Sequence, residues 1–165
     1  MSVQLHDYIS VADKADELGC NIPTGLALLP RNFRDAKTKK DLIHESSTST
    51  VRVLLRQANI PETRLENKEE RFPEAVEEAF EWIGPIIFVG YSILTQNPHV
   101  LAIALGVISN YLSDWFKGIP RDRRRVRFDI VLETKQKTCK RIHYDGDIEG
   151  LKQLPEIIRE VKLDG

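Results

Sequence analysis

The sequence predicts an α+β fold in which a small, mostly antiparallel sheet packs against a long apolar helical hairpin and a C-terminal helix. Three observations support this prediction. In residues 125–144, apolar and polar side chains alternate over two segments, which is typical of strands with one buried face. Residues 98–116 are apolar over the length of a long helix. Residues 147–161 carry apolar side chains at helical spacing, so the chain ends in the order strand, strand, helix.

The composition is that of an ordinary globular domain. The chain has 165 residues, of which 41% are hydrophobic and 30% are charged, enough to form a hydrophobic core. We expect a single domain over residues 1–165, with an N-terminal portion (1–61), an acidic-to-apolar portion (62–118) and a C-terminal portion (119–165). The formal net charge of -1 excludes a uniformly basic nucleic-acid-binding protein, so such binding would require a local patch.

The cysteines and the N-terminal residues indicate a cytoplasmic protein. Cys20 and Cys139 lack C-x-x-C spacing, which fits a reducing compartment better than a disulfide-bonded secreted domain. The first residues, MSVQLHDYIS, lack the basic and apolar regions of a secretory signal. We therefore expect a cytoplasmic localisation.

The N-terminal portion predicts two helices and one strand. Residues 10–18 contain good helix formers and are followed by Gly19, a typical C-terminal cap. Residues 25–29 form an apolar run, flanked by prolines, that is short enough for a buried strand, with a helix as the alternative. Residues 46–61, SSTSTVRVLLRQANIP, offer Ser and Thr N-caps and an apolar face and end at Pro61, so a helix is predicted there.

The middle portion begins with an acidic segment. Residues 62–81 contain eight glutamates against three basic residues. A helix is predicted to begin at Pro73, where the missing N–H costs nothing, and to bury a stripe of apolar side chains. These are Val76, Ala79, Phe80 and Ile83. Gly84-Pro85 then interrupts the helix before a second apolar segment.

Residues 82–116 belong either to the protein core or to a membrane. A spanning helix needs about 20 mostly apolar residues, and residues 85–94 are too few. Residues 98–116 are long enough but contain His99, Asn110 and Asp114, which make insertion costly. These observations favour the core, with a membrane-inserted hairpin as the alternative.

Small residues recur at every fourth position of the helix predicted over residues 98–116. Ala102, Gly106 and Asn110 form this ridge, which permits close approach of another helix. We therefore expect it to mark helix packing or an oligomer interface.

The C-terminal portion predicts a hairpin and a closing helix. Val126, Phe128, Ile130 and Leu132 define the buried face of the first strand. A turn at residues 135–137 leads into the second strand at 138–144. A helix follows from Asp147, its N-cap, and Pro155 should divide it or mark its real start.

A dense group of basic residues lies on and beside this hairpin. Guanidinium groups match phosphate oxygens, so the group could bind nucleic acid or another anionic partner. The alternatives are a charged strand edge that prevents aggregation, and pairing with the acidic segment. The residues are Arg121, Arg123, Arg124, Arg125, Arg127, Lys140 and Arg141, with Lys135 and Lys137 nearby.

A second set of residues suggests a metal-dependent nuclease. Asp129, Glu133 and Lys135 share one strand face if the strand continues, and Glu133-Thr134-Lys135 resembles the acid-x-lysine element of the restriction-endonuclease-like nucleases. The interval between the acids is shorter than that family uses. Cross-strand ion pairs explain the same pattern without catalysis.

The other polar residues show no signature of catalysis. The sequence contains no nucleophile elbow around the polar residues His143, Tyr144, Asp145 and Asp147. The spacing of its histidines and cysteines does not match that of zinc ligands. A Walker loop and a dinucleotide fingerprint are also missing, so we expect no metal and no cofactor. The sequence thus favours a non-catalytic interaction or regulatory subunit that binds a protein partner or associates with itself. A membrane-active effector and a small nuclease are the alternatives.

Overall fold

The sheet at the centre of the protein confirms the predicted α+β class. The computed structural model describes residues 2–76 and 81–161. Its sheet has six strands in the order β1-β6-β5-β4-β2, and the short β3 also pairs with β5. The neighbours β1/β6, β5/β6 and β2/β4 are antiparallel, whereas β3 and β4 run parallel to β5. The strands are β1 (Ser2–Tyr8), β2 (Leu26–Leu29), β3 (Trp82–Ile83), β4 (Ile86–Val89), β5 (Val126–Glu133) and β6 (Cys139–Gly146).

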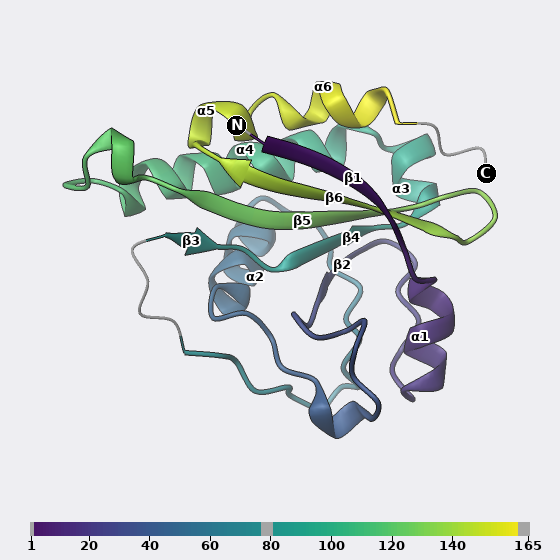
Figure 1. Cartoon of the computed structure of the whole chain (residues 1–165). Helices are drawn as coiled ribbons and strands as arrows, with labels where there is room; N and C mark the ends of the chain where they lie inside the picture. The colour runs from purple at the N-terminus through teal and green to yellow at the C-terminus, as the bar shows by residue number, and fades with distance from the viewer. Residues whose placement is uncertain (1, 77–80, 162–165) are drawn as a thin grey trace.

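Helices lie on both faces of this sheet. Figure 1 shows α4, α5 and α6 on one side of the sheet and α1 on the other. The predicted N-terminal helices are confirmed as α1 and α2, and Pro155 lies in the first turn of α6, so the closing helix is divided as expected. The helices are α1 (Val11–Glu17), α2 (Thr48–Gln57), α3 (Tyr91–Gln96), α4 (His99–Trp115), α5 (Ile148–Leu151) and α6 (Leu154–Arg159), with 3₁₀ helices η1 (Lys39–Asp41) and η2 (Arg121–Arg123).

Each face of the sheet has its own hydrophobic core. The predicted buried face of β5 packs with α2, α4, α5 and α6 in the larger core. The smaller core lies on the opposite face, where α1 and the loop containing Phe33 cover Phe88 and Val131. Val131, which lies on the face of β5 opposite Ile130 and Leu132, is therefore buried as well. Beyond Val131, toward the start of β5, this second face carries polar side chains.

The predicted helical hairpin over residues 82–116 is replaced by strands and one long helix. Residues 82–96 form β3, β4 and α3, and only α4 is a long helix. The apolar run of β4 lies between β2 and β5 in the sheet, which suits a fully buried strand. Gly84 and Pro85 separate β3 from β4. No helix in the described residues combines the length and hydropathy that crossing a membrane requires.

The helix expected from Pro73 is also absent from the described residues 73–76. Glu74 instead forms an isolated β-bridge with His44, and Val76, expected to be buried, is 88% exposed. Ile83 belongs to β3. The other two members of the expected stripe, Ala79 and Phe80, lie outside the described residues.

The acidic segment is held to the protein by ion pairs with basic side chains. Arg52 of α2 contacts Glu62 at 3.0 Å and Glu66 at 2.9 Å. Arg64 contacts Glu66 at 2.8 Å, and Nε2 of the buried His44 lies 3.5 Å from the Glu66 carboxylate. These contacts tie the loop after α2 to the helix, so the carboxylates at this point do not form a free acidic surface.

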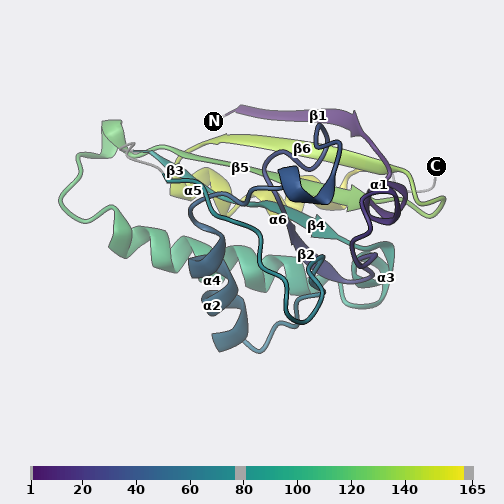
Figure 2. The ribbon, with the colours of Figure 1, turned by 90° about the horizontal axis from the view of Figure 1, so that it is seen from below.

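Helix α4 is amphipathic rather than apolar all round. Its buried side faces the sheet with Leu101, Leu105, Ile108 and Leu112, and Figure 2 shows α2 crossing it. The helix begins at His99 with Pro98 as N-cap, one residue later than predicted. In the small-residue ridge, Ala102 is half-buried, whereas Gly106 and Asn110 are exposed.

Candidate functional site

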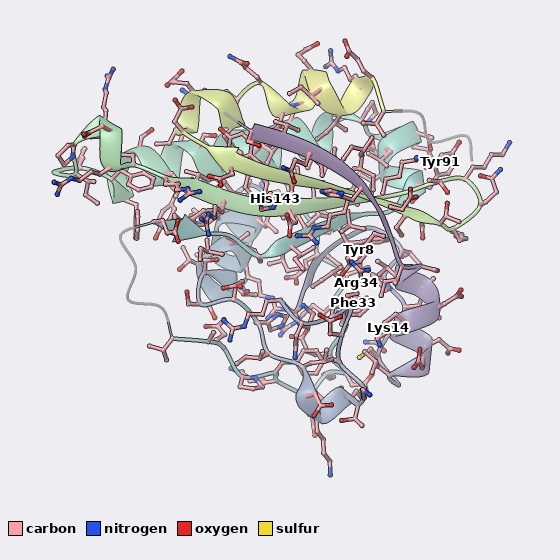
Figure 3. The ribbon with its side chains drawn as sticks, viewed as in Figure 1. Tyr8, Lys14, Phe33, Arg34, Tyr91 and His143 are labelled. Atoms are coloured by element: carbon pink, nitrogen blue, oxygen red, sulfur yellow. The ribbon has the colours of Figure 1, made fainter. Side chains whose placement is uncertain are left out.

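The polar half of the second sheet face brings together side chains from β5 and β6. In the antiparallel register, Asp129 lies opposite His143. The Asp129 carboxylate is 2.6 Å from Nδ1 of His143 and 2.9 Å from Nη2 of Arg141. Figure 3 shows His143 on the open part of the sheet, with Tyr8, Phe33 and Arg34 below the sheet where the smaller core begins. Each carboxylate oxygen of Asp129 therefore contacts a side chain of β6.

Tyr8 marks the boundary between the open and the covered halves of this face. Its ring packs against the smaller core, and its hydroxyl is buried. Burial raises the pKa of Tyr8 to about 12, with the charges of Arg141 and Asp129 acting in opposite directions. The phenol therefore stays neutral at physiological pH.

A second polar group lies next to the first, nearer the start of β5. Asp145 accepts two hydrogen bonds from Arg125, at 2.8 Å from Nε and 2.6 Å from Nη2. Arg127 lies 3.5 Å from Asp145 and 3.4 Å from Glu81. The hydrogen bonds from Arg125 lower the pKa of Asp145. Glu81 belongs to the acidic segment, so part of that segment pairs with the basic hairpin, one of the alternatives the sequence left open.

The structure divides the predicted anion-binding group. Three of its members pair with carboxylates at the polar half of the second sheet face: Arg125, Arg127 and Arg141. Lys140 lies opposite Leu132 on the other face of the sheet, since side chains alternate along β6. The remaining three lie in or after η2: Arg121 and Arg123 are exposed, and Arg124 donates from Nε to the carbonyl of Ile119 at 2.8 Å. These seven residues do not form one continuous basic surface.

The three residues of the nuclease hypothesis are not brought to one point. Glu133 is buried and accepts a hydrogen bond from the backbone N–H of Tyr91 at 3.1 Å, where it holds the start of α3. Asp129 lies four residues away along β5, a separation of roughly 13 Å at the usual strand rise. Lys135 lies in the turn after the strand has ended. Among the described residues, no cluster of three or more His, Cys, Asp or Glu side chains could hold a metal ion.

The exposed edge strand β1 is a feature that the sequence reasoning missed. It pairs with β6 from Ser2↔Asp145 to Tyr8↔Cys139 and is the last strand on its side of the sheet. Five of its seven residues are exposed, and Leu5 is 53% exposed. The sequence pattern that would predict this strand is weak because neither face of β1 is consistently apolar.

Sequence reasoning also missed an aromatic pocket beside β3. Trp82, Tyr111 and Trp115 line it together with Glu81 and hydroxyl side chains near the start of α2. The segments involved are far apart in the sequence, so no local motif could have indicated the pocket. Comparisons of the chain with protein-family models, with curated proteins and with solved structures find no match.

Proposed function

We propose that the protein is a non-catalytic subunit that assembles by strand pairing along β1, with a second copy of the chain as its partner. The observation that carries the proposal is the open edge of β1. One side of this strand pairs with β6 over its full length, and no described strand pairs with the other side. Backbone N–H and C=O groups of alternate residues point outward along such an edge and can bind another strand.

The β1 edge has little of the usual protection against pairing. Exposed edges are commonly shielded by charged side chains, especially lysine, by proline or a bulge, or by a short strand length. β1 has seven residues, SVQLHDY, in which Asp7 is the one acidic side chain and lysine and proline are missing, and its pairing with β6 is continuous. Its largest apolar side chain, Leu5, is 53% exposed. An edge of this kind favours association.

A second copy is a chemically suitable partner because the edge is self-complementary. Full overlap of two antiparallel copies of residues 2–8 places Leu5 opposite Leu5 on a two-fold axis. Gln4 then lies opposite His6, and Val3 opposite Asp7. No like charges face each other, and the central pair is apolar.

The non-catalytic part of the proposal rests on how the candidate catalytic groups are used. Asp129 pairs with Arg141 and His143. Glu133 is buried at the start of α3. Both carboxylates already have structural roles, which supports a subunit rather than a nuclease.

Size-exclusion chromatography with light scattering, over a wide range of protein concentration, tests the proposal. The wild type should form a dimer, and Leu5→Lys should shift it to monomer because two like charges would meet on the two-fold axis. Val53→Lys is the matched control: Val53 is an exposed apolar residue on α2, 44% exposed, so this variant should remain a dimer. A wild type that is monomeric at every concentration, or a Leu5→Lys variant that still forms a dimer, would overturn it.

A further inference from the structure

A small aromatic pocket lies between α2, β3 and the C-terminal part of α4. Its walls include Trp82 next to Glu81, Tyr111 and Trp115 of α4, and the hydroxyl residues Ser46 and Thr50. Its volume is about 170 Å³. Pockets that hold drug-sized ligands measure roughly 300–1,000 Å³, so this one accepts a small group rather than a whole cofactor.

The aromatic side chains are held in place by their neighbours. Trp82 is buried, and its six-membered ring packs so closely on Gly84 that a Cβ there would lie 2.6 Å from Cζ3. Trp115 packs edge-on against buried Phe116, with ring centroids 4.8 Å apart, yet remains 38% exposed. The pocket therefore has one fixed inner ring and one ring at its mouth. Faces of aromatic rings carry partial negative charge and attract cations.

The charged wall of the pocket is a carboxylate. Glu81 lines the pocket, whereas the guanidinium groups of Arg125 and Arg127, which lie 3.8 and 3.4 Å from it, are not among the lining residues. Both arginines also contact Asp145, so two carboxylates share two guanidinium groups. The Ser47 hydroxyl, also in the pocket wall, donates to the carbonyl of Ile83 at 2.7 Å. Glu81 is therefore the charged side chain among the residues that line the pocket, and its carboxylate also pairs with the two guanidinium groups behind it.

We propose that this pocket binds a quaternary or methylated ammonium group. Such a group is cationic, compact and covered by methyl groups, so it matches aromatic walls and a carboxylate without needing strong hydrogen-bond acceptors. An anionic ligand would meet Glu81. The pocket lies beside β3, away from the β1 edge, so the proposal is independent of the assembly through β1.

Tryptophan fluorescence is a direct reporter of this pocket. The chain contains two tryptophans, and both line the pocket. Titration with choline should change the emission saturably. Its neutral isostere 3,3-dimethylbutan-1-ol has the same shape without the charge and should cause no saturable change. Isothermal titration calorimetry on the same protein supplies a readout that does not depend on tryptophan.

Two variants test the residues that carry the proposal. Trp115→Leu should weaken choline binding roughly tenfold, as expected for loss of one cation–π contact. Glu81→Gln should weaken it severalfold because the carboxylate charge is removed. Asp114→Asn is the control: Asp114 is an exposed carboxylate next to Trp115 that pairs with Lys117 and does not line the pocket, so binding should stay unchanged. Circular dichroism checks that each variant is folded.

The source of the ammonium group is resolved by a second titration. A short peptide that contains trimethyllysine is compared with the same peptide carrying unmodified lysine. Tighter binding of the trimethylated peptide than of choline would identify a modified partner protein as the source, and equal or weaker binding would identify a free small molecule. The proposal is overturned if neither choline nor the trimethylated peptide binds, or if the neutral isostere binds as well as choline.

Discussion

Gly90 lies directly against the backbone carbonyl of Thr24. A Cβ atom at Gly90 would approach this oxygen to well inside 3.0 Å, and the N–H of Gly90 donates to the carbonyl of Gly25 at 2.9 Å. The contact joins the end of β4 to the residues that lead into β2. Both neighbours at this point are backbone, so neither can move aside as a side chain can.

Gly90→Ala should therefore destabilise the protein. The added methyl group must displace one of two paired strands, and we expect a loss of about 3 kcal/mol or more in the free energy of unfolding. Urea unfolding followed by circular dichroism measures it. Stability equal to the wild type would show that the segment before β2 is not held in the position described.

Gly106→Ala should have the opposite effect. Gly106 lies inside α4, and a Cβ there would meet no atom within 4 Å. Replacing glycine by alanine in a helix interior stabilises the folded protein by about 0.5–1 kcal/mol, since the unfolded chain loses conformational freedom.

The Gly106→Ala variant also tests the small-residue ridge. If two copies packed closely at Gly106, the methyl group would weaken their association in light scattering, whereas pairing through β1 would leave the association unchanged.

Stability at acid pH should depend on Glu66. Burial alone would raise the pKa of this carboxyl, but its contacts with His44 and Arg64 and the charge of Arg52 outweigh burial and lower the pKa to about 2. A carboxyl with a lowered pKa stabilises the folded state above its ordinary pKa of 4.5, and this contribution is lost as the pH falls from 4.5 to 2. Its size is about 3 kcal/mol.

The difference between wild type and Glu66→Gln isolates this effect from other carboxyl groups. At neutral pH the variant should unfold more easily by about 3 kcal/mol, because the guanidinium groups of Arg52 and Arg64 lose a buried partner. The two proteins should converge in stability between pH 4.5 and pH 2. The free energy of unfolding of both proteins is measured by urea unfolding at each pH. A difference between them that stays constant from pH 4.5 to pH 2 would contradict the low pKa of Glu66. Glu156→Gln, at an exposed ion pair on α6, serves as the control.

The elements that could be predicted from sequence are those with local signals. The alternation of Val126, Phe128 and Ile130 with polar residues indicated β5, and the apolar length and flanking residues of α4 indicated a helix. The elements that were missed depend on tertiary context. β1 has no consistent apolar face because it lies at the sheet edge. The run of β4 was assigned to a helix because a short apolar segment suits a buried helix as well as a buried strand.

Predicting the candidate site requires the register of the sheet as well as the sequence pattern of each strand. Asp129 and His143 were each noted in the sequence, but only the pairing of β5 with β6 places them opposite each other. The same register separates Arg141 from Lys140, which point to opposite faces. The basic group looked continuous in the sequence because adjacent residues on a strand were counted together.

The two thiols should be unreactive in the folded protein. Burial raises the pKa of Cys139 to about 11, and burial likewise raises the pKa of Cys20. Both side chains are buried, so the reactive thiolate is scarce and inaccessible. Ellman's reagent should react slowly with the native protein and rapidly with both thiols in urea. Fast reaction of one thiol under native conditions would show that its core opens readily.

Anion binding by the hairpin should be limited by Asp145 rather than by the number of arginines. The carboxylate of Asp145 holds Arg125 with two hydrogen bonds and also contacts Arg127. Asp145→Asn removes that charge and leaves Arg125 and Arg127 to share the carboxylate of Glu81, so the variant should elute from a heparin column at higher salt than the wild type.

Asp122→Asn is the matched control for this change. It raises the net charge by the same amount but lies in the exposed turn of η2 rather than beside Arg125 and Arg127. Its elution should shift much less than that of Asp145→Asn, because overall charge alone acts weakly at the salt concentrations used. Equal shifts for the two variants would mean that net charge, and not release of Arg125, controls binding. A wild type that already binds as tightly as Asp145→Asn would mean that the guanidinium groups are available despite their carboxylate partners.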